Sequence, residues 1–113
     1  MSREQTTTIK RQLRDQLDTS GWVILDHARD DWWLEAEWEI TSQRDKRDLR
    51  LYVTFLVDPQ EEGRVWSITV TPAPMRDRLD EYRRVGQATM QRGKLERNIA
   101  ELVAAINGFR DAP

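Results

Sequence analysis

Two stretches near the middle of the chain decide its fold: WWLEAEWEITS at residues 32–42 and LRLYVTFLVD at residues 49–58. Every second residue of the later stretch is apolar, from Leu49 to Val57. This alternation predicts a half-buried β-strand, because successive side chains of a strand point to opposite faces of the sheet. The earlier stretch alternates in the same way, and one face of its strand carries three glutamates (Glu35, Glu37 and Glu39).

Two further strands are expected beside this pair, at residues 22–29 and 64–71. The polar segments 43–48 and 59–63 are short, which favours an antiparallel meander. A two-residue turn at Asp30-Asp31 would place Leu25 opposite Ala36 and His27 opposite Leu34. Pro72 and Pro74 then end the sheet, since proline cannot donate to a strand ladder.

A helix is predicted on each side of the strand region, because apolar residues recur there with helical spacing. Ile9, Leu13 and Leu17 recur every four residues within 2–20, and Gly21 is a plausible cap for that helix. From Lys94 onward a broader stripe predicts a second helix that ends near Asn107-Gly108; it comprises Leu95, Ile99, Leu102, Val103, Ile106 and Phe109. Residues 76–92 show only a weak stripe, so a weak helix is expected there.

The resulting order is α-β-β-β-β-(α)-α, a single α+β domain over residues 1–113. We expect a two-layer sandwich in which the helices cover one face of a four-stranded antiparallel sheet. The residues expected to face the helices are Leu34, Ala36, Trp38, Ile40, Leu51, Val53, Phe55, Trp66, Ile68 and Val70.

The composition narrows the range of function classes. The chain has 113 residues and no cysteine, which excludes disulfides, thiolate zinc sites and cysteine nucleophiles. The polar start of the chain and the lack of a long apolar run argue against a signal peptide and a membrane span, so a cytoplasmic protein is expected. The net charge of −2 argues against whole-chain affinity for nucleic acid.

The sequence offers little for catalysis, and we expect neither enzymatic activity, nor a cofactor, nor a metal site. His27 is the only histidine, which excludes any two-histidine zinc site. Phosphate-binding loops are absent by motif, and Ser67 has no partner for nucleophilic catalysis. A small-molecule site around His27, with Asp26 and Glu35, is one alternative; the other is a purely structural role for the histidine.

An arginine-rich segment at residues 76–97 is the basis of a second alternative, a nucleic-acid-associated or regulatory protein. This segment contains seven Lys/Arg and four Asp/Glu residues. Only Tyr82 offers an aromatic platform beside the basic residues, and spacings such as Asp80–Arg84 suggest internal ion pairs instead. The candidate nucleic-acid contacts are Arg76, Arg78, Arg83, Arg84, Arg92 and Lys94.

The outer face of the sheet is the preferred functional surface. By alternation, several large apolar side chains, Val65 among them, point away from the expected core, and a soluble protein rarely exposes such a patch without a use for it. The candidate interface residues are Trp22, Ile24, Trp33, Glu35, Glu37, Tyr52 and Leu56. We favour self-association as a homodimer through this face. The alternatives are that the N-terminal helix covers the face, that a different protein binds it, or that the apolar residues are scattered over an ordinary surface. The acidic row could also be a solvated face that pairs with Arg50 and Tyr52.

We therefore expect a small non-enzymatic protein-interaction module, chaperone-like or adaptor-like in action. Its size, acidity and helix–sheet–helix layout resemble those of secretion-chaperone-type domains, at the level of layout alone. That resemblance implies a protein or peptide client.

Overall fold

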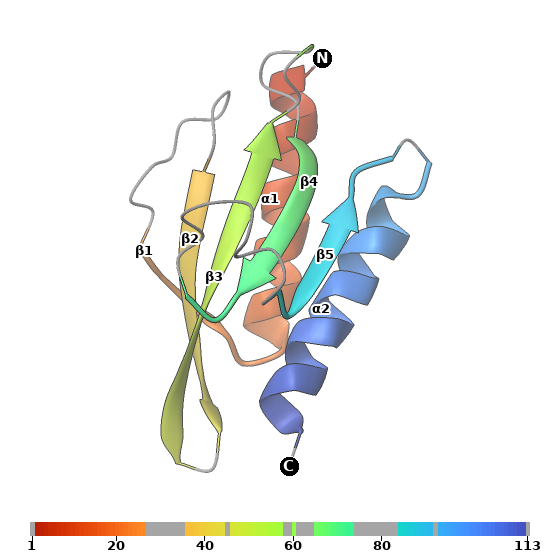
Figure 1. The fold of residues 1–113 in the computed structure, drawn as a ribbon. Coiled ribbons are helices and arrows are strands. Elements are labelled where there is room, and N and C mark those ends of the chain that lie inside the picture. Colours follow the sequence, from red (N-terminus) through yellow and green to blue (C-terminus); the bar gives the residue numbers. More distant parts are fainter. Residues whose placement is uncertain are drawn as a thin grey trace.

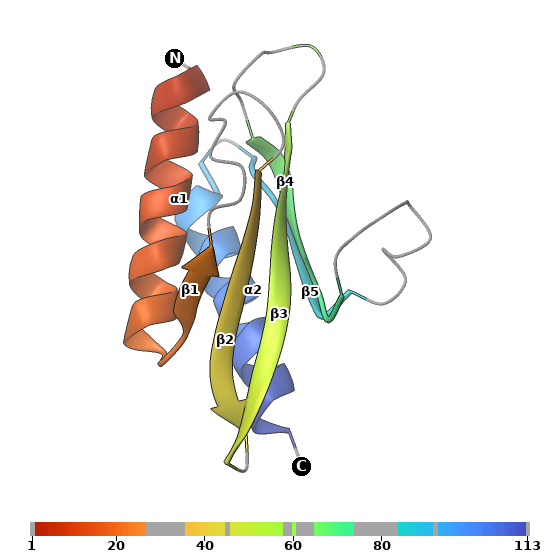
Figure 2. The same ribbon diagram turned by 90° about the vertical axis from the view of Figure 1, so that its left-hand side faces the viewer.

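The computed structural model describes residues 2–26, 36–44, 46–57, 60, 65–73, 84–91 and 93–112. Its helices and strands are α1 (Ser2–Thr19), β1 (Val23–Asp26), β2 (Ala36–Arg44), β3 (Arg47–Val57), β4 (Val65–Thr71), β5 (Gly86–Thr89) and α2 (Leu95–Asp111). The strands form one antiparallel sheet in the order β1-β2-β3-β4-β5 (Figure 1). Figure 2 shows both helices on the same side of this sheet. The expected α+β architecture is confirmed, with one strand more than the sequence predicted.

The core fills the space between the sheet and the two helices. Ile9, Leu13 and Leu17 of α1 are fully buried, and the stripe of α2 buries Ile99, Leu102, Val103 and Ile106 against the same cluster. Of the residues expected to face the helices, seven are buried: Trp38, Ile40, Leu51, Val53, Phe55, Ile68 and Val70. Leu34 and the Ala36 side chain lie outside the described part of the chain. The rings of Trp38 and Phe55 meet edge to face, with their centroids 4.8 Å apart.

The β2–β3 hairpin is tighter than the expected loop at residues 43–48. Gln43 lies opposite Asp48 and Arg44 opposite Arg47, so the ladder continues almost to the turn. Lys46 takes a left-handed φ of 66°, the conformation that two-residue hairpin turns use.

A β-bulge on β4 reverses two expected orientations. Leu56 lies opposite Ser67 but Val57 lies opposite Val65, which leaves Trp66 as an extra residue on β4. Val65 is therefore buried with the core, whereas Trp66 is 56% exposed. The expectations of an inward Trp66 and an outward Val65 were both wrong, because strict alternation does not survive a bulge.

The first strand has a different register from the one expected. Ile24 lies opposite Ile40, whereas the two-residue turn would have put Leu25 opposite Ala36. The two registers differ by an odd number of residues, and an odd shift exchanges the faces of a strand. Ile24 accordingly packs against the core, so its expected outward position was wrong, while Val23 and Leu25 are exposed on the outer face.

The last third of the chain departs from expectation in two ways. Where a weak helix was expected at 76–92, the described residues 84–91 contain β5, which pairs with β4 from Gly86 opposite Val70 to Thr89 opposite Ser67. In addition, α2 passes through Asn107-Gly108 and ends only at Asp111. Contacts of its last turn with the α1–β1 connection outweigh the low helix propensity of this pair.

Candidate functional site

β5 is an edge strand: β4 occupies one of its sides, and no further strand pairs with the other side within the described residues. β5 lies close to α2 because two of its residues, Gly86 and Ala88, are small. A Cβ atom added to Gly86 would lie 3.1 Å from Leu102 Cδ1 and 3.3 Å from Ala105 Cβ. A larger residue at position 86 would push the helix away, so this glycine sets the width of the space between β5 and α2.

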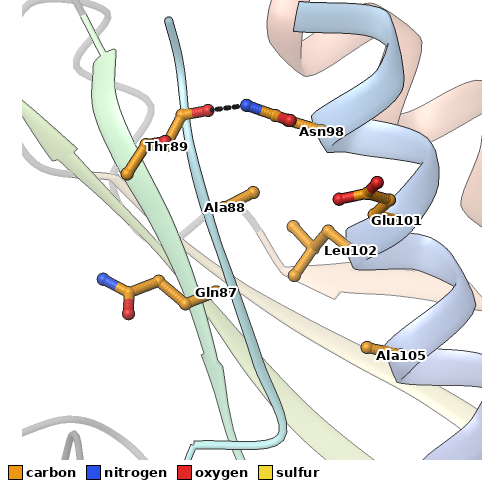
Figure 3. Close-up of a pocket in the computed structure, with 7 residues that line it drawn as sticks. All are labelled: Gln87, Ala88, Thr89, Asn98, Glu101, Leu102 and Ala105. Carbon is orange, nitrogen blue, oxygen red and sulfur yellow. Dashed lines mark hydrogen bonds between the residues drawn. The ribbon is translucent and has the colours of Figure 1, made fainter. Parts of the chain in front are cut away.

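The backbone of β5 directs hydrogen-bonding groups toward this open side. The amide of Met90 donates to the carbonyl of Trp66 on β4 at 2.9 Å. Because alternate residues of an antiparallel strand face the same neighbour, Ala88 also bonds toward β4, and Gln87 and Thr89 direct their N–H and C=O groups away from it. The direction of Thr89 is visible in its carbonyl, which accepts a hydrogen bond from Asn98 Nδ2 on α2 at 2.7 Å (Figure 3).

Between β5 and α2 these groups border a groove of about 320 Å³. Ala88 points from the strand toward the helix, and Leu102 points back toward the strand (Figure 3). The residues that line the groove are Gln87, Ala88, Thr89, Asn98, Glu101, Leu102 and Ala105. One wall of the groove is the edge of β5. The other wall consists of the apolar side chains of Leu102 and Ala105, with the Asn98 amide and the Glu101 carboxylate beside them.

The charge inside the groove is small. Among the described residues that line the groove, Glu101 is the only charged one, and Arg97, one turn earlier on the same helix face, donates to Glu101 Oε1 at 3.2 Å. Both side chains are well exposed, and exposed pairs of this kind contribute little to stability. The groove is therefore suited to hydrogen bonding and packing more than to binding a strongly charged ligand.

The helix wall is held in place at its C-terminal end by a polar cluster. The indole N–H of the buried Trp22 donates to Asn107 Oδ1 at 2.9 Å, and Asn107 Nδ2 donates to Ser20 Oγ at 3.1 Å. Arg110 donates to the Ser20 carbonyl at 2.6 Å and to Ser42 Oγ at 3.1 Å. These contacts fasten the last turns of α2 to the α1–β1 connection and to β2.

Two further contacts of Arg110 complete this cluster. Its guanidinium lies over the Trp22 ring at 5.3 Å, within the range of a cation–π interaction. Its Nε donates to the carboxylate of Asp111, and this hydrogen bond holds the pKa of Asp111 below its usual value. The expected Gly21 cap is also confirmed: Gly21 has a φ of 88°, and the Trp22 amide bonds back to the Leu17 carbonyl.

The expected interface residues are not brought together as one outer patch. Trp22 is 1% exposed, so its expected place on the outer face was wrong: its ring fills the space between the α1–β1 connection and α2. Glu37, Tyr52 and Leu56 are half-buried. Trp33 and Glu35 lie outside the described residues.

Part of the acidic row forms the cross-strand pairs that the sequence suggested. Arg50 lies 3.0 Å from Glu39, and the Tyr52 hydroxyl donates to the same carboxylate at 3.2 Å. The centre of this outer face is closed, since Thr54, Ser67, Thr69 and Thr71 are at most 1% exposed. The hydroxyls of Thr54, Ser67 and Thr69 have no hydrogen-bond partner within the described structure. The open part of the face is therefore its rim, where Val23, Leu25 and Trp66 are exposed.

The other two predicted sites are largely outside the described ranges. His27 and Glu35 are not among the described residues, and of Asp26 only the backbone is described. Of the arginine-rich segment, Arg76, Arg78, Arg83 and Arg92 are likewise outside, and Arg84 and Lys94 are exposed. Within the described ranges, no group of three or more histidine, cysteine or acidic residues could hold a metal ion.

Comparison of the chain with protein-family models, with curated proteins and with solved structures found no match. Among the described residues, no helix is both long enough and apolar enough to cross a membrane.

The groove residues were missed at the sequence level. The one available signal was the alternation of Ala88 and Met90 with Gln87 and Thr89, a period-2 pattern of strand type. This pattern is short, and it adjoins charged residues whose spacing predicts a weak helix.

Proposed function

We propose that this chain is a non-enzymatic protein-interaction module that binds an extended peptide segment as an additional strand on the open edge of β5. The observation that carries the proposal is the outward direction of the Gln87 and Thr89 backbone groups into the groove beside α2. Strand addition supplies affinity through main-chain hydrogen bonds and specificity through pockets for alternate side chains. The cytoplasm is the proposed compartment.

The groove geometry supports a peptide as the occupant in preference to the edge of a second copy. In Figure 1, α2 runs beside β5 on the side away from β4. A second domain brought up to this edge would also have to accommodate α2, which is much bulkier than a single strand. A single extended segment needs less room: it would lie along the open edge of β5 and direct every other side chain into the groove, toward Ala88, Leu102 and Ala105.

The substitution Gln87→Pro tests this proposal. Because the Gln87 amide points away from β4, proline at this position removes an outward donor while the β4–β5 ladder is kept. The probe is an acetylated eight-residue peptide of alternating lysine and valine, titrated against labelled protein in fluorescence anisotropy. We expect Gln87→Pro to weaken binding about tenfold, the order of one lost hydrogen bond with an unsatisfied partner.

Gln87→Ala is the matched control, since it removes the side chain and keeps the amide. It should bind the peptide as the parent chain does. Equal binding by all three proteins would show that the β5 edge takes no part, and absence of binding by the parent chain would contradict strand addition of this peptide class.

A second candidate function is self-association through the rim of the outer face, and the exposure of Val23 and Leu25 on edge strand β1 favours it. Such apolar side chains on a strand edge commonly form contacts between chains. Light scattering after size exclusion, at low and high salt, should then give a dimer that persists at high salt. A Leu25→Lys variant should be monomeric, whereas a monomeric parent chain at all concentrations would eliminate this candidate.

A further inference from the structure

One of the outward groups of β5 is already engaged. The carbonyl of Thr89 accepts the hydrogen bond from Asn98 Nδ2 at 2.7 Å, and the Asn98 side chain stands at that end of the groove (Figure 3). Within the described residues, the outward groups without a partner are the N–H and C=O of Gln87 and the N–H of Thr89. The edge therefore offers two free donors but only one free acceptor, because the Thr89 carbonyl would have to share its acceptor oxygen with Asn98.

This imbalance bears on any strand that adds in the antiparallel direction. The peptide residue opposite Gln87 exchanges both of its hydrogen bonds with that residue. The peptide residue opposite Thr89 accepts from the Thr89 amide, but its own N–H has to share the Thr89 carbonyl with Asn98 or displace the Asn98 side chain. Either outcome weakens one hydrogen bond, so this position disfavours a residue that carries an amide proton.

Proline is the residue that fits this position, because it lacks the N–H and still offers its carbonyl to Thr89. Its ring would also find room. Residues opposite one another in an antiparallel pair point to the same face, and the side chain of Thr89 lies on the outer face with that of Ser67. The ring would thus stand away from α2.

We propose that Asn98 is a specificity-determining residue that makes the groove select extended peptides with proline opposite Thr89. This inference rests on the proposed strand addition at β5. It adds that the selection is made by the amide of Asn98, which competes with the peptide for one carbonyl.

The test compares two acetylated eight-residue peptides built on alternating lysine and valine, which differ only in carrying alanine or proline at the third residue. Dissociation constants are measured by fluorescence anisotropy for the parent chain, Asn98→Ala and the control Glu96→Gln, an exposed residue of α2 that does not line the groove. The parent chain should bind the proline peptide about threefold to fivefold more tightly than the alanine peptide, because the alanine N–H must share or displace an exposed hydrogen bond worth about 1 kcal/mol or less. Asn98→Ala should lose this preference, because the Thr89 carbonyl becomes free, and Glu96→Gln should keep it.

The outcomes separate this inference from the proposed function. Equal affinity of the parent chain for both peptides overturns the selection of proline and leaves strand addition standing. A preference for proline that survives in Asn98→Ala overturns the role of Asn98. If neither peptide binds to the parent chain, both the selection and the strand addition of such peptides are wrong.

Discussion

At the scale of single residues, Asn107 joins parts of the chain that are far apart in sequence. Its carbonyl accepts from the indole of Trp22, and its amide donates to Ser20, 85 and 87 residues away along the chain. Trp22 is almost fully buried, so Asn107 satisfies a donor that water reaches poorly. The position of α2, and with it the wall of the groove, depends on this contact.

We expect Asn107→Ala to lower the free energy of unfolding by about 1–3 kcal/mol, because the buried indole N–H loses its acceptor. The matched control is Asn98→Ala on the same helix, whose hydrogen bond to Thr89 is exposed; its loss should stay within about 1 kcal/mol. Urea denaturation midpoints of the two variants give the comparison. Equal losses would mean that the Trp22–Asn107 bond is not sheltered from water.

At the scale of elements, the glycines of β5 and α2 lie in different surroundings, and only Gly86 takes part in the packing of the strand on the helix. Gly86 has Leu102 and Ala105 within 3.4 Å of the place that a Cβ atom would take, whereas Gly108 of α2 has nothing within 4 Å. The backbone of Gly108 does not have a positive φ, so an alanine there meets neither strain nor a neighbour. The two positions therefore respond oppositely to a larger side chain.

Gly86→Val should destabilise the protein by about 1–3 kcal/mol through overpacking between β5 and α2. Gly108→Ala should stabilise it by about 0.5–1 kcal/mol. Alanine has the higher helix propensity, and it reduces the conformational entropy of the unfolded chain, so less entropy is lost on folding. Thermal and urea unfolding of both variants give the signs. Full tolerance of valine at position 86 would show that the strand and the helix are not in close contact.

The elements also show what the sequence could predict. The inward faces of β2 and β3 were predicted correctly, because long alternation such as that from Leu49 to Val57 leaves one choice of face. β5 was missed because four residues with one buried alanine carry too weak a pattern. The face of β1 was wrong because it depends on a register that no local signal fixes, and the orientation of Trp66 depends on a bulge.

At the scale of the whole molecule, placing both helices on one face leaves the sheet with two different edges. The β1 edge carries a register irregularity between Ile24 and Asp26, a feature that discourages further strand pairing. The β5 edge is bordered by α2, which turns it into a groove. The sequence could not predict this site, because the groove exists only through the contact of α2 with β5, a strand that the sequence analysis missed.

The central claim is that the Gln87 and Thr89 amides face an open edge that accepts a strand. Residue-resolved amide hydrogen exchange by NMR, without and with a saturating amount of the lysine–valine peptide, tests it most directly. In the free protein we expect fast exchange at Gln87 and Thr89 and slow exchange at Ala88, which faces β4. The peptide should then slow exchange at Gln87 and Thr89 and leave Ala88 unchanged. Slow exchange of the Gln87 and Thr89 amides in the free protein, or peptide binding that leaves both of them fast, would contradict the account.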